Sequence, residues 1–316
     1  MLSRRKLMAA GGGLAVAAPA ARAAQFPERE IVAYVQYAAG GSTDIAVRAL
    51  TAEAEKVLGV PIQVVNRPGG QGTVGPQTVA SARPDGYTIG VAGLTSISVV
   101  PHLLEVPYNR DSFTYLAAFA GYRYGLAVRA DSPFRSLADL IQHAKTRRTT
   151  FSATGAPNNL GAFALARLSG ARFQFVPFPS GAEAVTAALG GHVDFVLQAP
   201  PEILPAVQSG RARLLASGSA ERWPEQPEVP TFRELGFDVV VQATAGLVGP
   251  AGIPEDRARL LGETFLQVAR SPAYHAALDR MGMLPEPIDG AEFERRAREL
   301  FVTAGQSLRE AGLARR

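Results

Sequence analysis

The sequence predicts an α/β protein with two lobes and a ligand site between them. Strands and helices alternate twice, first over residues 31–91 and again over residues 137–216. Such alternation is typical of parallel sheets with right-handed crossovers. An apolar segment, residues 239–248, follows the second series. We therefore expect the chain to leave one lobe, build a second and return, so that two strands connect them. At 316 residues the chain is long enough for both.

Residues 1–23 have the composition of an export signal. Arg4 and Arg5 precede a run of small and apolar residues, and the signal ends in a small-residue cleavage site. The adjacent arginines favour a twin-arginine signal, while an ordinary secretory signal remains the alternative. In either case we expect a periplasmic protein that is soluble after cleavage near Ala24.

Composition argues against several classes of function. Four of the 32 Lys and Arg residues lie in the leader, which leaves 28 against 28 Asp and Glu, so no nucleic-acid partner is expected. The chain has no cysteine for disulfides or thiolate metal sites. Its four histidines lack paired metal-ligand spacing, and no Gly-x-Ser-x-Gly motif is present. We expect no metal, no cofactor and no enzymatic activity. Hydrolysis, with a base for Ser42 supplied from elsewhere in the fold, is the weak alternative.

The first candidate binding loop follows the strand predicted at residues 31–35. Gly40 and Gly41 lead into a helix that Ser42 or Thr43 can cap. The free N–H groups and dipole of a helix N-terminus favour an anion such as a carboxylate or phosphate. The loop lacks the lysine of a nucleotide-binding P-loop. An ordinary strand-to-helix turn has the same local pattern and stays open as the alternative.

Small polar residues also follow four later strands, at the carboxyl ends where open parallel sheets bind ligands. Each alone is more often a helix cap, but together they can face the first loop across a cleft. They are Thr95 and Ser96 after strand 87–91, Thr154, Gly155, Asn158 and Asn159 after strand 149–152, Ser180 and Gly181 after strand 173–178, and Gln198 after strand 193–197.

Three further elements complete the prediction. A helix is expected at residues 204–208, and residues 219–230 read as a proline-rich surface loop that carries Trp223, the only tryptophan. Residues from 254 onward are expected to form a long amphipathic helical region.

A series of short motifs resembles one family over essentially the whole mature chain. The sequence is similar to the Bug-type substrate-binding proteins of tripartite tricarboxylate transporters. The resemblance implies a type II periplasmic-binding-protein fold, with lobe 1 at residues 24–125 plus 246–316 and lobe 2 at residues 126–245. The motifs are Ala39-Gly40-Gly41-Ser42-Thr43-Asp44 with Arg48, residues 66–72 (NRPGGQG), 84–88 (PDGYT), 106–108 (VPY), 176–178 (VPF), 189–194 (LGGHVD), 227–231 (PEVPT) and 246–252 (GLVGPAG).

The resemblance also implies how a ligand is held. Backbone amides and ordered water from the first loop and its facing loop would bind a small carboxylate, which adds Tyr37, Ala39 and Asp44 to the candidate site. We expect Asp44 to orient the loop, with Arg48 as its ion-pair partner. Where members commonly carry an acidic residue this chain has Gln198, which favours a carboxylate without an ammonium group. A membrane permease or a sensor kinase is the expected partner of a monomer.

Overall fold

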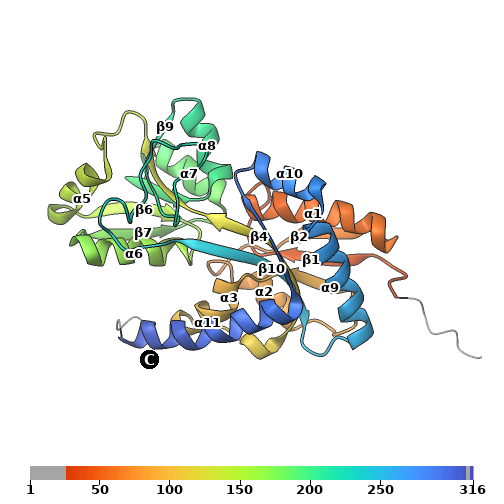
Figure 1. Cartoon of the computed structure of the whole chain (residues 1–316). Helices are drawn as coiled ribbons and strands as arrows, with labels where there is room; N and C mark the ends of the chain where they lie inside the picture. The colour runs from red at the N-terminus through yellow and green to blue at the C-terminus, as the bar shows by residue number, and fades with distance from the viewer. Residues whose placement is uncertain (1–25, 311–313, 316) are drawn as a thin grey trace, which may run out of the picture.

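The computed structural model describes residues 26–310 and 314–315, which form two α/β lobes (Figure 1). The predicted export signal lies outside the described residues. Lobe 1 contains a six-stranded sheet, and lobe 2 contains a five-stranded one. The lobe boundaries given above stay predictions at the level of single residues.

The sheet of lobe 1 has the strand order β11-β4-β10-β3-β1-β2. Its first half is parallel, as predicted, because β1 pairs in parallel with both β2 and β3. Its other strands pair antiparallel. The strands are β1 Ile31–Val35, β2 Ile62–Asn66, β3 Thr88–Val91, β4 Phe113–Arg123, β10 Gln242–Pro250 and β11 Leu284–Asp289.

Apolar residues spaced four apart bury the first helix of lobe 1 against this sheet. Ala46, Leu50 and Ala54 of α1 are fully buried, and Gly59 ends the helix in a left-handed conformation. The helices of this lobe are α1 Ser42–Leu58, α2 Val74–Ala80, α3 Leu94–Ser98, α4 Val100–Leu103, the 3₁₀ turn η1 Arg110–Ser112, α9 Glu255–Ala269, α10 Pro272–Arg280 and α11 Gly290–Glu310.

The sheet of lobe 2 has the order β7-β6-β8-β5-β9, and β6 pairs in parallel with β7 and β8. Phe151 lies at the centre of its core, surrounded by the rings of four other phenylalanines. The elements are β5 Gly125–Arg129, α5 Leu137–Thr146, β6 Thr149–Ala153, α6 Asn158–Ser169, β7 Phe173–Pro177, α7 Gly181–Leu189, β8 Phe195–Gln198, α8 Pro200–Gln208 and β9 Ala212–Ser217.

Two long strands connect the lobes, as the sequence predicts. β4 and β10 pair antiparallel over their whole lengths and extend from lobe 1 toward lobe 2 (Figure 1). At the end of β4, the buried Arg123 donates a 2.9 Å hydrogen bond to Glu225 and another to the carbonyl of Gly282. One guanidinium therefore ties a loop of lobe 2 to lobe 1 beside the connection.

Three sequence predictions are wrong in detail. Trp223 is completely buried, with its indole N–H donating to Ser219, because the loop after β9 folds back over lobe 2. The C-terminal region is not wholly helical, since β11 interrupts it as an edge strand that tolerates two prolines. Helix α8 begins at Pro200, four residues before the predicted start.

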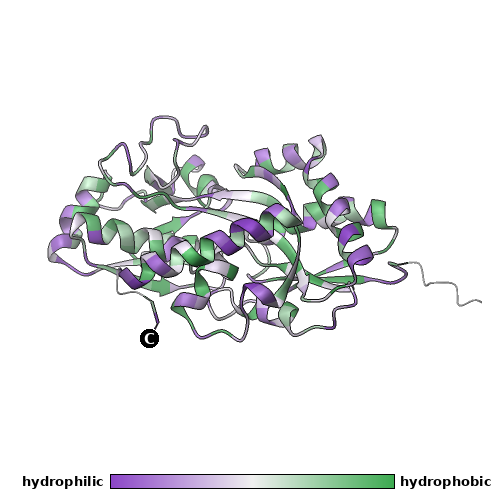
Figure 2. Cartoon of the chain, turned by 60° about the horizontal axis from the view of Figure 1, so that its bottom comes forward, coloured by the Kyte–Doolittle hydropathy of each residue, from purple (hydrophilic) through white to green (hydrophobic). Residues whose placement is uncertain are grey.

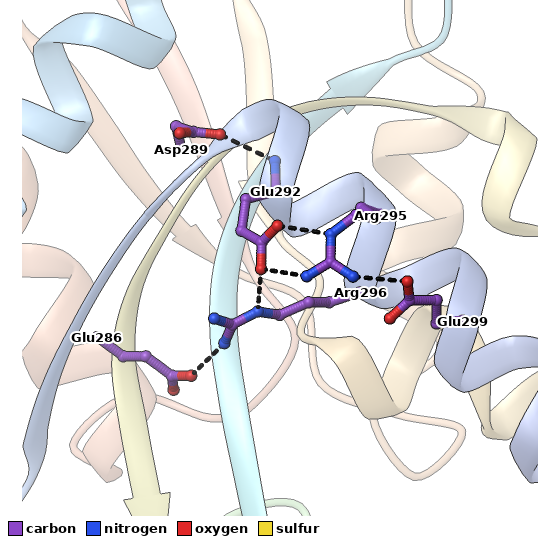
Figure 3. Close-up of polar contacts among 6 residues, drawn as sticks. All are labelled: Glu286, Asp289, Glu292, Arg295, Arg296 and Glu299. Atoms are coloured by element: carbon purple, nitrogen blue, oxygen red, sulfur yellow. Dashed lines mark hydrogen bonds and ion pairs between the residues drawn. The ribbon is translucent and has the colours of Figure 1, made fainter.

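The last helix, α11, is amphipathic and alternates between hydrophilic and hydrophobic residues along its length (Figure 2). Phe293 and Ala297 are fully buried on one face. On the exposed face, Glu292 accepts hydrogen bonds of 2.7 Å from both Arg295 and Arg296 (Figure 3). These two guanidinium groups lower the pKa of Glu292 to about 2.

Glu292→Gln should lower the melting temperature slightly at pH 7. A depressed carboxyl pKa stabilises the fold above the unfolded value of about 4.3, and this contribution disappears as the pH falls through about 2. The pair is exposed, so about 1 M salt should screen most of the difference. Thermal unfolding of wild type and variant at two salt concentrations checks this. Glu263→Gln on α9 is the control, because Glu263 is exposed and makes no ion pair with any described residue. A Glu292 effect that persists in high salt would contradict the electrostatic explanation.

Candidate functional site

A small cavity of about 50 Å³ lies between the lobes, where the predicted loops meet. The loop after β1, the starts of α1 and α3, and strands β3, β4 and β10 form one wall. The ends of lobe 2 strands and the starts of its helices form the other. The lining residues are Gln36, Tyr37, Gly41, Ser42, Thr43, Val91, Gly93, Thr95, Ser96, Tyr122, Tyr124, Thr154, Ala156, Pro157, Gly181, Gln198, Glu202, Ala243, Thr244 and Ala245.

Helix N-termini supply the positive potential at this cavity. Helices α1 and α7 begin at it with Ser42 and Gly181, and Pro157 caps α6 beside it. The first-turn N–H groups of a helix have no intrahelical acceptor and favour negative charge. The described residues that line the cavity include no Lys, Arg or His. An anion here would meet backbone dipoles instead of a cationic side chain.

The structure brings together nine of the sixteen predicted site residues. Lining the cavity are Tyr37, Gly41, Ser42, Thr43, Thr95, Ser96, Thr154, Gly181 and Gln198. The expectation that Thr95 and Ser96 share a crevice with Ser42 and Thr43 is thus confirmed. Outside the lining are Ala39, Gly40, Asp44, Gly155, Asn158, Asn159 and Ser180. Ligand contact by any of these residues stays a prediction.

The predicted residues outside the lining either lie at the surface or hold the cavity wall in position. Ala39 and Gly40 are exposed, because Gly40 adopts a left-handed turn (φ 83°) that carries this part of the loop to the surface. Asn158 is buried and donates to the side chain of Gln198 at 2.9 Å, so it positions that amide. Ser180 caps α7 by accepting a hydrogen bond from the N–H of Glu183.

Asp44 orients the first loop, as expected. Its carboxylate accepts a 3.0 Å hydrogen bond from the N–H of Gly40 and pairs with Arg48 at 3.0 Å. Burial by itself would raise the pKa of Asp44, but Arg48, Gly40 and Asn66 together hold that pKa below its ordinary value. Asp44 is therefore a structural anion of the loop.

The lobes are closed on each other around the cavity. The N–H of Ala38 donates to the carbonyl of Pro179 at 3.2 Å, and the N–H of Ser42 donates to Glu202 at 2.8 Å. Gly155 lies so close to the other lobe that a Cβ on it would be 2.9 Å from the carbonyl oxygen of Gln71. The space left is small because these contacts bring the walls together.

Comparison with known proteins identifies the family. Residues 46–313 match the family model described as "Tripartite tricarboxylate transporter family receptor". The chain belongs to this receptor family. The receptor is 33% identical over 321 residues to the "UPF0065 protein in gbd 5'region" of Cupriavidus necator, covering 99% of this chain and 98% of that protein. It is 28% identical over 281 residues to BugT of Bordetella pertussis, covering 85% of each. The resemblance to Bug-type proteins is confirmed.

A solved structure confirms the fold as well. MatC from Rhodopseudomonas palustris, solved with bound malate, is 28% identical to the receptor and superposes with a TM-score of 0.82. The match covers 89% of this chain and 99% of MatC. The receptor therefore has the two-lobed periplasmic-binding-protein fold. Within the described part of the chain, no helix has the length and hydropathy needed to cross a membrane.

Glu202, which the sequence did not place at the site, is the one acidic side chain among the described residues that line the cavity. It projects from the first turn of α8 in lobe 2 and accepts from Ser42 in lobe 1. Burial raises the pKa of Glu202, and the N–H and hydroxyl of Ser42 partly offset this. A signal was available, because Pro200 and Pro201 directly after a strand favour a helix N-terminus at this point.

Tyrosine hydroxyls line the rest of the receptor's cavity. Tyr122 donates to the hydroxyl of Thr43 at 3.2 Å, and Tyr37 interacts with Thr154 across the lobes. Burial raises the pKa of Tyr37, Tyr122 and Tyr124, so all three stay neutral at ordinary pH. The wall is thus polar and aromatic without adding charge. Tyr122 and Tyr124 stand on the segment that connects the lobes, which the sequence did not place at the site.

Gly155→Ala should weaken ligand binding about fivefold by opposing closure. Its Cβ would meet the carbonyl of Gln71 at 2.9 Å, and relieving such a contact costs about 1 kcal/mol when a loop can shift. Gly170→Ala is the control for a methyl group on a positive-φ glycine outside the cavity lining, because Gly170 has φ 73° and a Cβ there has no described atom within 4 Å. Titration calorimetry checks both variants. Equal losses in the two would attribute the effect to backbone strain instead of closure.

Proposed function

We propose that this receptor binds a small carboxylate in the interlobe cavity, in the periplasm, and delivers it to a tripartite tricarboxylate-type membrane permease. The proposal rests on the convergence of helix N-termini on a cavity between the two lobes, without cationic side chains among its described lining residues. Directed N–H groups recognise a carboxylate without the large desolvation cost of a buried Lys or Arg.

Membership of the receptor family supports this assignment. MatC, which shares the fold at 28% identity, was solved with malate. We infer the same class of ligand for this chain. The exact acid, its affinity and the transporter partner are part of the proposal.

Closure provides the mechanism of delivery. A ligand that contacts α1 of lobe 1 and α7 of lobe 2 interacts more favourably with the closed state than with an open one, so it shifts the population toward closure. The permease then distinguishes loaded from empty receptor by the shape of the two lobes. We expect the mature receptor, from about Ala24 onward, to act as a monomer, which size-exclusion chromatography with light scattering tests.

The experiment is a thermal-shift screen of the mature protein after unfolding and refolding to remove any co-purified ligand. The panel contains monocarboxylates, dicarboxylates, tricarboxylates, amino acids and aromatic acids. A ligand that binds only the folded state stabilises it by RT ln(1 + [L]/Kd), or about 2.7 kcal/mol at a hundredfold excess over Kd. A rise for one carboxylate series supports the proposal. No rise for any carboxylate, with folding verified by circular dichroism, would overturn it.

A further inference from the structure

Glu202 faces the cavity with one oxygen paired and the other unpaired. Its Oε1 accepts the 2.8 Å hydrogen bond from the N–H of Ser42. Its Oε2 is buried and accepts no hydrogen bond from any residue that the structure describes. A buried carboxylate oxygen without a donor is costly, since charged groups lose more than neutral ones when they leave water. A hydrogen-bond donor placed next to Oε2 would therefore stabilise this arrangement.

Gly181 makes room for this carboxylate. A Cβ at Gly181 would lie 2.8 Å from Oε1 of Glu202 and 2.7 Å from Nε2 of Gln198, both closer than real side chains come. The start of α7 thus holds the carboxylate in a fitted position between two lobes. Glu202 is therefore packed into the cavity wall and is not an exposed surface residue.

The surrounding described wall does not supply the missing donor. Tyr122 donates to Thr43 instead, and the Ser42 hydroxyl, which lowers the pKa of Glu202, makes no hydrogen bond to Oε2. The side-chain oxygen of Gln198 accepts from Asn158 and from the N–H of Ala199, which fixes that amide in place. With no Lys, Arg or His among the described lining residues, a water or a bound ligand is left to supply the donor to Oε2, and a ligand that carries its own donor fills this position directly.

A second acceptor lies in the same cavity. The side-chain oxygen of Gln36 is buried and has no donor among the described residues, while its nitrogen donates to Ser96 at 3.2 Å. Because the Ser96 hydroxyl can donate or accept, the Gln36 amide can turn either atom to a ligand. An ionised Glu202 can only accept hydrogen bonds, so it determines which ligand group can face it.

We propose that Glu202 is a specificity-determining residue that selects small carboxylates bearing a hydrogen-bond donor, an ammonium or a hydroxyl group, beside the carboxylate. The inference rests on the proposed function. The ligand carboxylate meets N–H groups at the helix N-termini, and its donor meets Oε2 of Glu202. Position 198 carries no acidic side chain in this receptor, but Glu202, four residues later in α8, brings a carboxyl group to the same cavity. This reverses the expectation, drawn from Gln198, of a ligand without an ammonium group.

Titration calorimetry on the mature receptor tests the proposal with acids that differ by one substituent. Succinate, malate and aspartate carry hydrogen, hydroxyl and ammonium at the same carbon, and glutarate with glutamate extends the comparison by one methylene. The variants are Glu202→Gln, which keeps the shape, and Glu183→Gln as the control. Glu183 is exposed in the first turn of α7 and does not line the cavity.

We expect wild type to bind at least one substituted acid about tenfold to a hundredfold tighter than the unsubstituted acid, the range of a hydrogen bond to a charged group. Glu202→Gln should reduce this ratio to within about threefold, and Glu183→Gln should preserve it. Equal affinities in wild type, or a preference that survives Glu202→Gln, would overturn the inference. So would loss of every acid in Glu202→Gln, because Glu202 would then serve closure in general.

Two outcomes separate this inference from the proposed function. If succinate binds as tightly as malate and aspartate, the receptor assignment stands and the selectivity of Glu202 fails. If wild type binds no carboxylate in the whole panel, the proposed function itself fails. Proton uptake on succinate binding, measured in two buffers of different ionisation enthalpy and absent in Glu202→Gln, would show that Glu202 is itself the donor and would also overturn the inference.

Discussion

Ser42→Pro should weaken carboxylate binding about tenfold to a hundredfold. Ser42 is the first residue of α1, and its N–H makes no intrahelical hydrogen bond but donates to Glu202 across the cleft. Proline is favoured at this helical position, and Gly41 before it already has extended backbone (φ −80°, ψ 166°) that suits a residue preceding proline. The substitution therefore removes one N–H from the site and leaves the helix intact. The bond lost joins Ser42 to the Glu202 carboxylate across the closed cleft, and losing a hydrogen bond to a charged group accounts for the size of the effect.

Ser42→Ala is the matched control for this variant. It removes the hydroxyl and keeps the N–H, so it should weaken binding by less than about fivefold. Calorimetry with the best ligand from the screen measures the affinities, and far-ultraviolet circular dichroism checks the helix content. Wild-type affinity in Ser42→Pro would show that the bond between Ser42 and Glu202 does not contribute to the ligand-bound closed state. Equal losses in both variants would assign the role to the hydroxyl.

Phe151→Ala should destabilise lobe 2 by about 3 to 5 kcal/mol, the usual cost of removing a large buried aromatic side chain. Phe151 is fully buried in β6 and its ring centroid lies 5.2 Å from that of Phe195 and 5.3 Å from that of Phe175. Few other positions touch as many aromatic rings of this lobe. The cavity left cannot be filled by small shifts, because the four neighbouring rings belong to two different strands and one helix.

Urea unfolding followed by tryptophan fluorescence measures this effect in the correct lobe. Trp223 is the only tryptophan of the chain and is buried in lobe 2, so its emission reports the unfolding of that lobe. Phe163→Ala is the control, because Phe163 is only partly buried and should cost less. Similar unfolding midpoints for Phe151→Ala and wild type would contradict the packing described for this core.

The fold was predictable where local signals and tertiary packing agree. Helix α1 begins at Ser42, one of the two residues predicted at its N-terminus, and Gly59 ends it by adopting a left-handed conformation. Strand β1 coincides with the apolar run at residues 31–35. Strand β11 was missed because two prolines argue against a strand, and an edge position relaxes that rule. The burial of Trp223 was not predicted, because the sequence of a proline-rich loop does not show which core its side chains pack against.

The site was predicted in part for a related physical reason. Loops that follow strands of a parallel sheet reach the same edge, so Ser42, Thr43 and Thr95 could be grouped from their order in the chain. Glu202 and Tyr122 reach the cavity through a helix start and a connecting strand, and only the closed arrangement of the lobes brings them there. Contacts across the cleft depend on that arrangement, which no local pattern encodes.

A crystal structure of the mature receptor with its best carboxylate ligand is the decisive test of where the ligand binds. We expect a ligand carboxylate in the interlobe cavity, within hydrogen-bond distance of N–H groups in the first turn of α1 or joined to them by an ordered water. Ligand density in a different cavity, or an unchanged cavity without ligand at a concentration that saturates binding in solution, would contradict it.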